Sequence, residues 1–180
     1  MQIKLMSNSN LSSRDAAVIW HPFTQHQIEP ASIPIASGKG AHLFDTDGKK
    51  YIDAISSWWV NTHGHGHPYL AQKIYEQALQ LEQVIFAGFT HEPAIQLAER
   101  LLGHLPANFQ KVFYSDNGST AVEVGVKMAL QFFHNQGQTQ KRKIIAFEDA
   151  YHGDTFGAMS LGAPSAFNAP FQDMLFEVEF

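Results

Sequence analysis

The strongest constraint on the fold is an alternation of strand and helix patterns in the second half of the sequence. Two short β-rich runs, Lys111–Ser115 and Lys143–Phe147, flank a segment whose apolar residues recur at helical spacing: Val122, Val126, Ala129, Leu130 and Phe133. Strands that alternate with helices of this length are typical of an α/β layer with parallel strands. The sequence therefore predicts the α/β fold class.

The end of the sequence has the pattern of a further strand. Its large apolar residues alternate with the others between them, at Met174, Phe176, Val178 and Phe180. Four large apolar residues on one face of a strand need a partner layer, and the strand edge needs a neighbour. We therefore expect this sequence to be a fragment of a larger fold.

The segment before residue 111 predicts a hairpin and two longer helices. The hairpin joins Ala41–Phe44 to Lys50–Ile55 through the turn residues 45–48. The first helix has its apolar stripe at Leu70, Ile74, Ala78, Leu81 and Ile85, and the second, opened by Glu92-Pro93, at Ile95, Ala98, Leu101 and Leu102. A short helical stretch is expected at Asp15–Ile19.

Composition narrows the classes of function. The 180 residues include 12 basic and 17 acidic ones, and the net charge of -5 weighs against a nucleic-acid partner, which basic residues would hold. Cysteine is absent, which excludes disulfides and thiolate metal sites. The sequence pattern predicts neither a signal peptide nor a membrane-spanning segment. A cytoplasmic protein without membrane or nucleic-acid partners is expected.

The most informative local segment is residues 115–123, where a predicted strand passes into a predicted helix. Gly118 lets a ligand approach the backbone, while Ser119 and Thr120 suit a helix start. Thr120 with Glu123 fits a capping box. Amides exposed at such a start attract phosphate, although an ordinary strand–turn–helix junction has the same pattern. Neither common nucleotide fingerprint, a Walker lysine or G-x-G-x-x-G, is present.

A second candidate segment, residues 149–155, follows the predicted strand Lys143–Phe147. Ligands of open α/β sheets collect beyond the carboxyl ends of the strands. Tyr151 is able to stack on a planar ring there, or to serve as a half-buried packing residue. Together the two segments suit one phosphorylated aromatic ligand. His152 and Asp154 are polar neighbours without an assigned acid–base role.

Three histidines at alternate positions, His63, His65 and His67, superficially resemble a zinc site. Glycines interrupt the segment, and no carboxylate or cysteine ligand follows at a fitting distance. We therefore expect no metal site.

Several motifs resemble those of the class III, ornithine-type aminotransferases, which use pyridoxal phosphate. Gly118-Ser119 with residues 121–129 is similar to the phosphate turn and helix of this family, and Tyr151-His152-Gly153 to its ring-stacking motif. Other segments resemble the branch that makes 7,8-diaminononanoate for biotin, with S-adenosyl-L-methionine as donor and 8-amino-7-oxononanoate as acceptor. These are residues 19–24, 56–59, 89–94 and 152–160.

The resemblance implies roles for single residues. Gly118 and Ser119 would bind the cofactor phosphate, and Tyr151 would stack on the cofactor ring. Trp58, with Trp59 and Phe23, would line the substrate pocket. If the two tryptophans are strand neighbours, at most one of them faces that pocket, and both could instead be core residues. Phe23 stands where several members of the family have tyrosine, so a hydroxyl is lost there.

The resemblance also implies a type I fold of pyridoxal-phosphate-dependent transferases, present here in part. Residues 1–60 would belong to the small domain and residues 61–180 to the beginning of the large one. The Schiff-base lysine and the carboxylate at the pyridine nitrogen lie past the matching segment in this family, so no catalytic residue is assigned and the isolated chain is expected to be inactive. The whole enzyme would be a homodimer. Two alternatives stay open: another amino donor or acceptor, and a non-catalytic cofactor-binding or dimerisation module.

Overall fold

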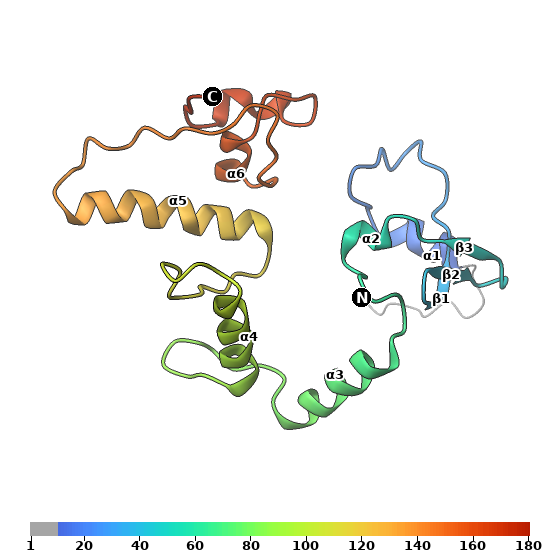
Figure 1. The fold of residues 1–180 in the computed structure, drawn as a ribbon. Helices are drawn as coiled ribbons and strands as arrows, with labels where there is room; N and C mark the ends of the chain where they lie inside the picture. Colours follow the sequence, from blue (N-terminus) through green and yellow to red (C-terminus); the bar gives the residue numbers. More distant parts are fainter. Residues whose placement is uncertain (1–10) are drawn as a thin grey trace, which may run out of the picture. The chain divides into compact units, whose positions relative to one another are not determined.

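The computed structural model describes residues 11–180, which divide into two compact units, one ending at Phe89 and one beginning at Thr90 (Figure 1). In the first unit, helix α1 spans Leu11–Val18. Three strands follow, β1 (Ile35–Lys39), β2 (His42–Asp45) and β3 (Lys50–Ile52), and they form an antiparallel sheet in the order β1-β2-β3. The predicted hairpin is confirmed as β2 and β3.

The turn of this hairpin is held by Asp45. Its Oδ1 accepts hydrogen bonds from the amides of Asp47 (2.9 Å) and Lys49 (2.8 Å), and its Oδ2 accepts one from the Tyr51 hydroxyl (2.9 Å). Burial alone would raise the pKa of Asp45, but the bond from Tyr51 and the two amides outweigh burial and lower it. Strand β3 ends at Ile52, earlier than the predicted Ile55, because the chain turns at Asp53 into α2 (Ser56–Trp59).

Two longer helices, α3 (Pro68–Gln80) and α4 (Glu92–Gly103), confirm the two helices predicted from their apolar stripes. Both begin with proline in the first turn, where no amide donor is needed. The helix α3 was predicted to extend further at its C-terminal end than it does. Leu81 has an extended backbone with φ -166°, so Leu81 and Ile85 lie outside the helix despite their spacing.

The second unit contains α4, α5 (Gly118–Asn135), α6 (Phe156–Leu161) and a 3-10 helix, η1 (Ala169–Met174). The predicted strand at Lys111–Ser115 is not formed, and Lys143–Phe147 contributes a single parallel bridge between Ile145 and Glu179. The amide of Ala146 donates to Glu179 O (2.9 Å), and the amide of Glu179 donates to Ile144 O (3.0 Å). A strand exists only with a paired neighbour, and sequence pattern does not supply the neighbour.

The predicted C-terminal strand is not formed either, because Met174 belongs to η1 and the rest of the segment contributes a single bridge residue, Glu179. The core of the second unit lies at α6, where Ala158 and Leu161 are the buried hydrophobic residues among those described. Two buried polar residues join them. Ser160 accepts a bond from the amide of Phe176 (3.1 Å), and Asn168 bonds to Ser165, Ala163 and Gln172. Over residues 11–180, no helix has the length and apolar character needed to span a membrane.

Candidate functional site

Helix α5 begins at the predicted phosphate turn. Asn117 is its N-cap: the Asn117 side chain accepts a bond from the amide of Thr120 (2.9 Å), and the Thr120 hydroxyl accepts one from the amide of Asn117 (3.3 Å). The predicted capping box of Thr120 with Glu123 is therefore wrong, because the helix starts three residues earlier than that pairing requires. Gly118 and Ser119 come first in the helix, so their amides have no intrahelical acceptor and are able to bind an anion.

The second predicted segment lies directly against this turn, although it is more than thirty residues further along the chain. The amide of Asp154 donates to the Ser119 Oγ (3.2 Å). Gly153 has φ +128°, and a Cβ atom on it would come within 2.1 Å of the Ser119 Oγ. The structure thus brings Ser119 and the Tyr151–Asp154 segment together at one place, as the sequence interpretation requires.

One turn further along α5, Glu123 makes a second connection between this helix and the segment that follows Tyr151. Its Oε1 accepts bonds from the Thr155 hydroxyl (2.6 Å) and from the amide of Gly157 (2.9 Å), at the beginning of α6. A Cβ atom on Gly157 would lie 2.3 Å from the Glu123 carboxylate, so a larger residue there would require this carboxylate to shift. Helices α5 and α6 consequently lie side by side (Figure 1). Sequence reasoning missed this role, since Glu123 had been interpreted as part of a local cap.

Tyr151 presents its ring to solvent beside the phosphate turn, with 74% of the residue exposed. Its hydroxyl donates to the Asp154 Oδ2 (2.7 Å), and this bond raises the pKa of Tyr151 above its usual range. The bond restrains the ring by its tip, and most of the residue stays exposed to solvent. Asp154, which had no role in the sequence interpretation, therefore orients Tyr151.

The residues predicted for the substrate pocket lie in the first unit. The rings of Phe23 and Trp58 make an edge-to-face contact with centroids 5.5 Å apart and an interplanar angle of 88°. All three predicted side chains are largely exposed: 70% for Phe23, 57% for Trp58 and 76% for Trp59. The structure thus brings Phe23 and Trp58 together.

The tryptophan pair does not lie in a strand, which corrects the sequence interpretation. Residues 56–59 form a single turn in which all four residues have positive φ, from 49° to 68°, and ψ is 55° at Ser57 and 48° at Trp58. A left-handed turn of non-glycine residues costs roughly 1–2 kcal/mol per residue, hence roughly 4–8 kcal/mol for this segment. Strain of this kind is concentrated at functional sites, and it needs compensating contacts to persist.

The three histidines are also placed by the structure. His65 bonds to Asp53 (2.8 Å), the Nδ1 of His63 bonds to the Thr62 hydroxyl (3.0 Å), and His63 and His67 have ring centroids 6.1 Å apart. Within residues 11–180 no group of three His, Cys, Asp or Glu side chains is arranged to hold a metal ion.

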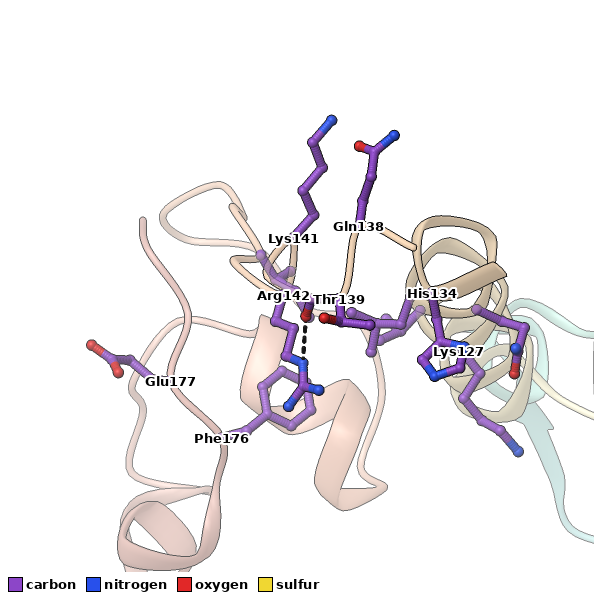
Figure 2. Close-up of a pocket in the computed structure, with 12 residues that line it drawn as sticks. Lys127, His134, Gln138, Thr139, Lys141, Arg142, Phe176 and Glu177 are labelled. Atoms are coloured by element: carbon purple, nitrogen blue, oxygen red, sulfur yellow. Dashed lines mark hydrogen bonds between the residues drawn. The ribbon is translucent and has the colours of Figure 1, made fainter. Parts of the chain in front are cut away.

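A cavity of about 580 Å³ lies along the C-terminal half of α5, between Val126 and His134 (Figure 2). Three cationic side chains border it, Lys127, Lys141 and Arg142. The imidazole of His134 and the apolar Val126, Leu130, Ile144 and Phe176 also line it. The Arg142 Nε donates to Thr139 O (2.8 Å), as the dashed line in Figure 2 shows. None of the residues predicted to bind cofactor or substrate lines this cavity.

The start of α5 and the exposed Tyr151 form a candidate ligand site, and comparison with known proteins shows which class of enzymes the chain belongs to. The sequence profile of the family "Aminotransferase class-III" matches residues 23–180. The chain belongs to this family, which confirms the resemblance read from its motifs.

Relatives within the family are more specific. The chain is 57% identical over 162 residues to the adenosylmethionine-8-amino-7-oxononanoate aminotransferase of Synechococcus elongatus, covering 90% of this chain and 38% of that protein. The crystal structure of the enzyme with the same name from Methanocaldococcus jannaschii has a TM-score of 0.88 and 38% identity, covering 94% of this chain and 39% of the other.

A third comparison is with an aminotransferase from Vibrio fluvialis in its PMP-bound form. It has a TM-score of 0.85 and 27% identity, covering 96% of this chain and 39% of the other. The predicted α/β fold class and partial type I transferase fold are confirmed by these neighbours. In each comparison the chain spans somewhat more than a third of the relative's length.

Proposed function

We propose that this chain is part of an aminotransferase that moves an amino group from S-adenosyl-L-methionine to 8-amino-7-oxononanoate and forms 7,8-diaminononanoate for biotin synthesis. The observation that carries the proposal is the 57% identity to the Synechococcus elongatus enzyme over 90% of this chain. The contact between Ser119 and the Tyr151–Asp154 segment supports it, because it joins the two motifs that the reaction requires.

The cofactor of the proposed reaction is pyridoxal 5'-phosphate, and the residues present suit it. The free amides of Gly118 and Ser119, with the positive end of the α5 dipole, favour a dianionic phosphate. The exposed ring of Tyr151 offers a flat apolar face to a pyridine ring. When bound, this cofactor supplies an electron sink for the substrate carbon, and the groups of this chain anchor and orient it.

Phe23, Trp58 and Trp59 are proposed to bind the two substrates. S-adenosyl-L-methionine carries a sulfonium cation and a flat adenine, and 8-amino-7-oxononanoate carries an apolar chain. Aromatic faces attract cations and bury apolar chains, so one aromatic pocket suits both molecules. The edge-to-face contact of Phe23 with Trp58 supports the proposal, because it holds the two rings together at one place.

The test uses the whole protein, expressed from the complete reading frame that contains this chain. Purified protein is supplied with 8-amino-7-oxononanoate and either S-adenosyl-L-methionine, lysine or an ω-amino acid, and 7,8-diaminononanoate is measured by mass spectrometry. Product is expected with S-adenosyl-L-methionine. Product with another donor alone would favour a different class III aminotransferase, and no cofactor-dependent product would favour a non-catalytic module.

Two further expectations depend on the resemblance. The whole enzyme is proposed to be a homodimer, because active sites of this family are shared between subunits, and to act in the cytoplasm. Light scattering during size-exclusion chromatography of the whole protein measures its oligomeric state. A monomer under assay conditions would contradict the proposed homodimer.

A further inference from the structure

The carboxylate of Asp53 is the centre of a hydrogen-bond network directly before the left-handed turn. Its Oδ1 accepts a bond from the amide of Ser57 (3.0 Å), and its Oδ2 accepts bonds from the Ser57 hydroxyl (2.8 Å) and the His65 Nε2 (2.8 Å). The Asp53 side chain is only 6% exposed. The bonds from the Ser57 amide and from His65 lower the pKa of Asp53 to about 2.

His65, the second partner of Asp53, is anchored to the sheet. Its backbone makes two bonds with Gly40, from Gly40 N to His65 O (3.0 Å) and from His65 N to Gly40 O (2.8 Å). Its Nδ1 accepts a bond from the Asn61 side chain (3.2 Å), so both ring nitrogens are paired in the tautomer that carries hydrogen on Nε2. Gly38 allows this arrangement, because a Cβ atom there would come within 2.7 Å of the His65 Cβ.

Asp53 therefore connects a rigid support to a strained segment. On one side lies His65, paired with the backbone of Gly40 beside strand β1. On the other lies Ser57, which has φ 49° and precedes Trp58 in the chain. Two of the three bonds to the carboxylate come from Ser57 itself, so they restrain the backbone at the residue where the left-handed conformation must be kept.

We infer that Asp53 is a positioning residue of the substrate pocket, which holds the 56–59 turn left-handed from its anchor at His65 and so presents Trp58 to substrate. It acts through Ser57 and does not itself contact substrate. The inference rests on the proposed function in one respect, the assignment of Trp58 to substrate binding.

The first test measures the turn without reference to activity. In the whole protein, hydrogen exchange of the peptide covering residues 53–60 is compared between wild type, Asp53→Asn and the matched control Asp47→Asn, an exposed carboxylate in the neighbouring hairpin turn. Asparagine has one acceptor oxygen and cannot keep all three bonds. Faster exchange at Ser57 is expected for Asp53→Asn alone, by about tenfold. Unchanged exchange in Asp53→Asn would overturn the inference.

The second test separates positioning from a general structural role. Glycine adopts positive φ without strain, so Ser57→Gly should relieve the need for Asp53. Asp53→Asn is expected to raise the KM for 8-amino-7-oxononanoate about tenfold with kcat changed less, since small displacements of binding groups have large effects. The double variant Asp53→Asn/Ser57→Gly is expected to recover most of that loss.

The outcomes distinguish the inference from the proposed function. If Asp53→Asn fails to fold while the double variant folds and binds substrate, the positioning role is upheld. If the double variant is no better than Asp53→Asn in folding, in hydrogen exchange at position 57 and in KM, the carboxylate is merely structural and the inference is wrong. A third outcome is that Asp53→Asn raises hydrogen exchange at position 57, the added Ser57→Gly substitution reverses this rise, and KM stays unchanged throughout. Asp53 then positions the turn, but the assignment of Trp58 to substrate binding is wrong.

Discussion

Gly153 lies in contact with Ser119, so closely that a Cβ atom on it would be 2.1 Å from the Ser119 Oγ and 2.8 Å from the Ser119 Cα. Rotation of the serine side chain would relieve the first contact but not the second. The φ of +128° at Gly153 is a further reason why only glycine fits. Through this contact the tyrosine segment reaches the phosphate turn.

Gly153→Ala is therefore expected to displace the tyrosine segment from α5. Overpacking of this kind costs about 1–3 kcal/mol, and backbone strain adds to it. We expect lower thermal stability and weaker pyridoxal phosphate binding in the whole protein, measured by cofactor absorbance. Gly162→Ala is the matched control, since a Cβ atom there meets nothing closer than 3.4 Å. Equal effects of the two substitutions would contradict the prediction.

Glu123→Ala is expected to loosen the joint between α5 and α6. It leaves the Thr155 hydroxyl and the amide of Gly157 without their acceptor, and an unsatisfied half-buried donor costs about 1–3 kcal/mol. Chemical denaturation should show this loss, and cofactor affinity should fall with it. Glu99→Ala, on the exposed side of α4, controls for the loss of a helical glutamate. The prediction fails if both variants unfold at the same denaturant concentration.

The ring and the hydroxyl of Tyr151 are expected to have separate effects. Tyr151→Ala removes the stacking face and should weaken cofactor binding by about two- to tenfold, whereas Tyr151→Phe should change it less. The pKa of Tyr151 is raised, so its phenol keeps its proton at neutral pH and its stabilising bond to Asp154 is lost only as pH rises through a value above 10.0. Phenolate absorbance, compared with that of Tyr151→Phe, measures this titration.

Asp53 should make stability depend on pH in the acid range. Its pKa is lowered from 3.8 to about 2, so its contribution is complete above the unfolded value and is lost as pH falls through about 2. Wild type should therefore lose more resistance to urea between pH 4 and pH 2 than Asp53→Asn does. Asp45, whose pKa is also lowered, is present in both proteins, so its effect cancels in the comparison. Parallel pH profiles would contradict the prediction.

The isolated 180-residue chain is expected to form no specific reduced lysine adduct with pyridoxal phosphate and borohydride. None of Lys49, Lys50, Lys111, Lys127 and Lys143 matches the family position that forms the Schiff base. The measurement is peptide mapping of the reduced product by mass spectrometry. A single modified lysine at stoichiometric yield would show that the chain holds its own amine for the reaction.

The local elements could largely be predicted from sequence. Helices α4 and α5 and the hairpin at Asp45 were expected from the sequence. Apolar spacing, proline and turn residues influence only the backbone within a few residues, so their effect can be predicted without the tertiary structure. The family was likewise predicted from the Gly118-Ser119 and Tyr151-His152-Gly153 motifs, and the profile match confirms it. The same reasoning wrongly predicted a strand at Lys111–Ser115. A strand needs a second strand to pair with, and the local sequence does not show whether one is present.

By itself, then, the sequence determined that α3, α4 and α5 are helices, which turn residues close the hairpin and which family the chain belongs to. Only the tertiary structure decided that Glu123 bonds to Thr155 rather than to a nearby cap, and that Trp58 lies in a left-handed turn tied to Asp53. The physical reason is that propensity acts between neighbours in the chain. A hydrogen bond between residues 32 positions apart depends on how the chain folds back on itself.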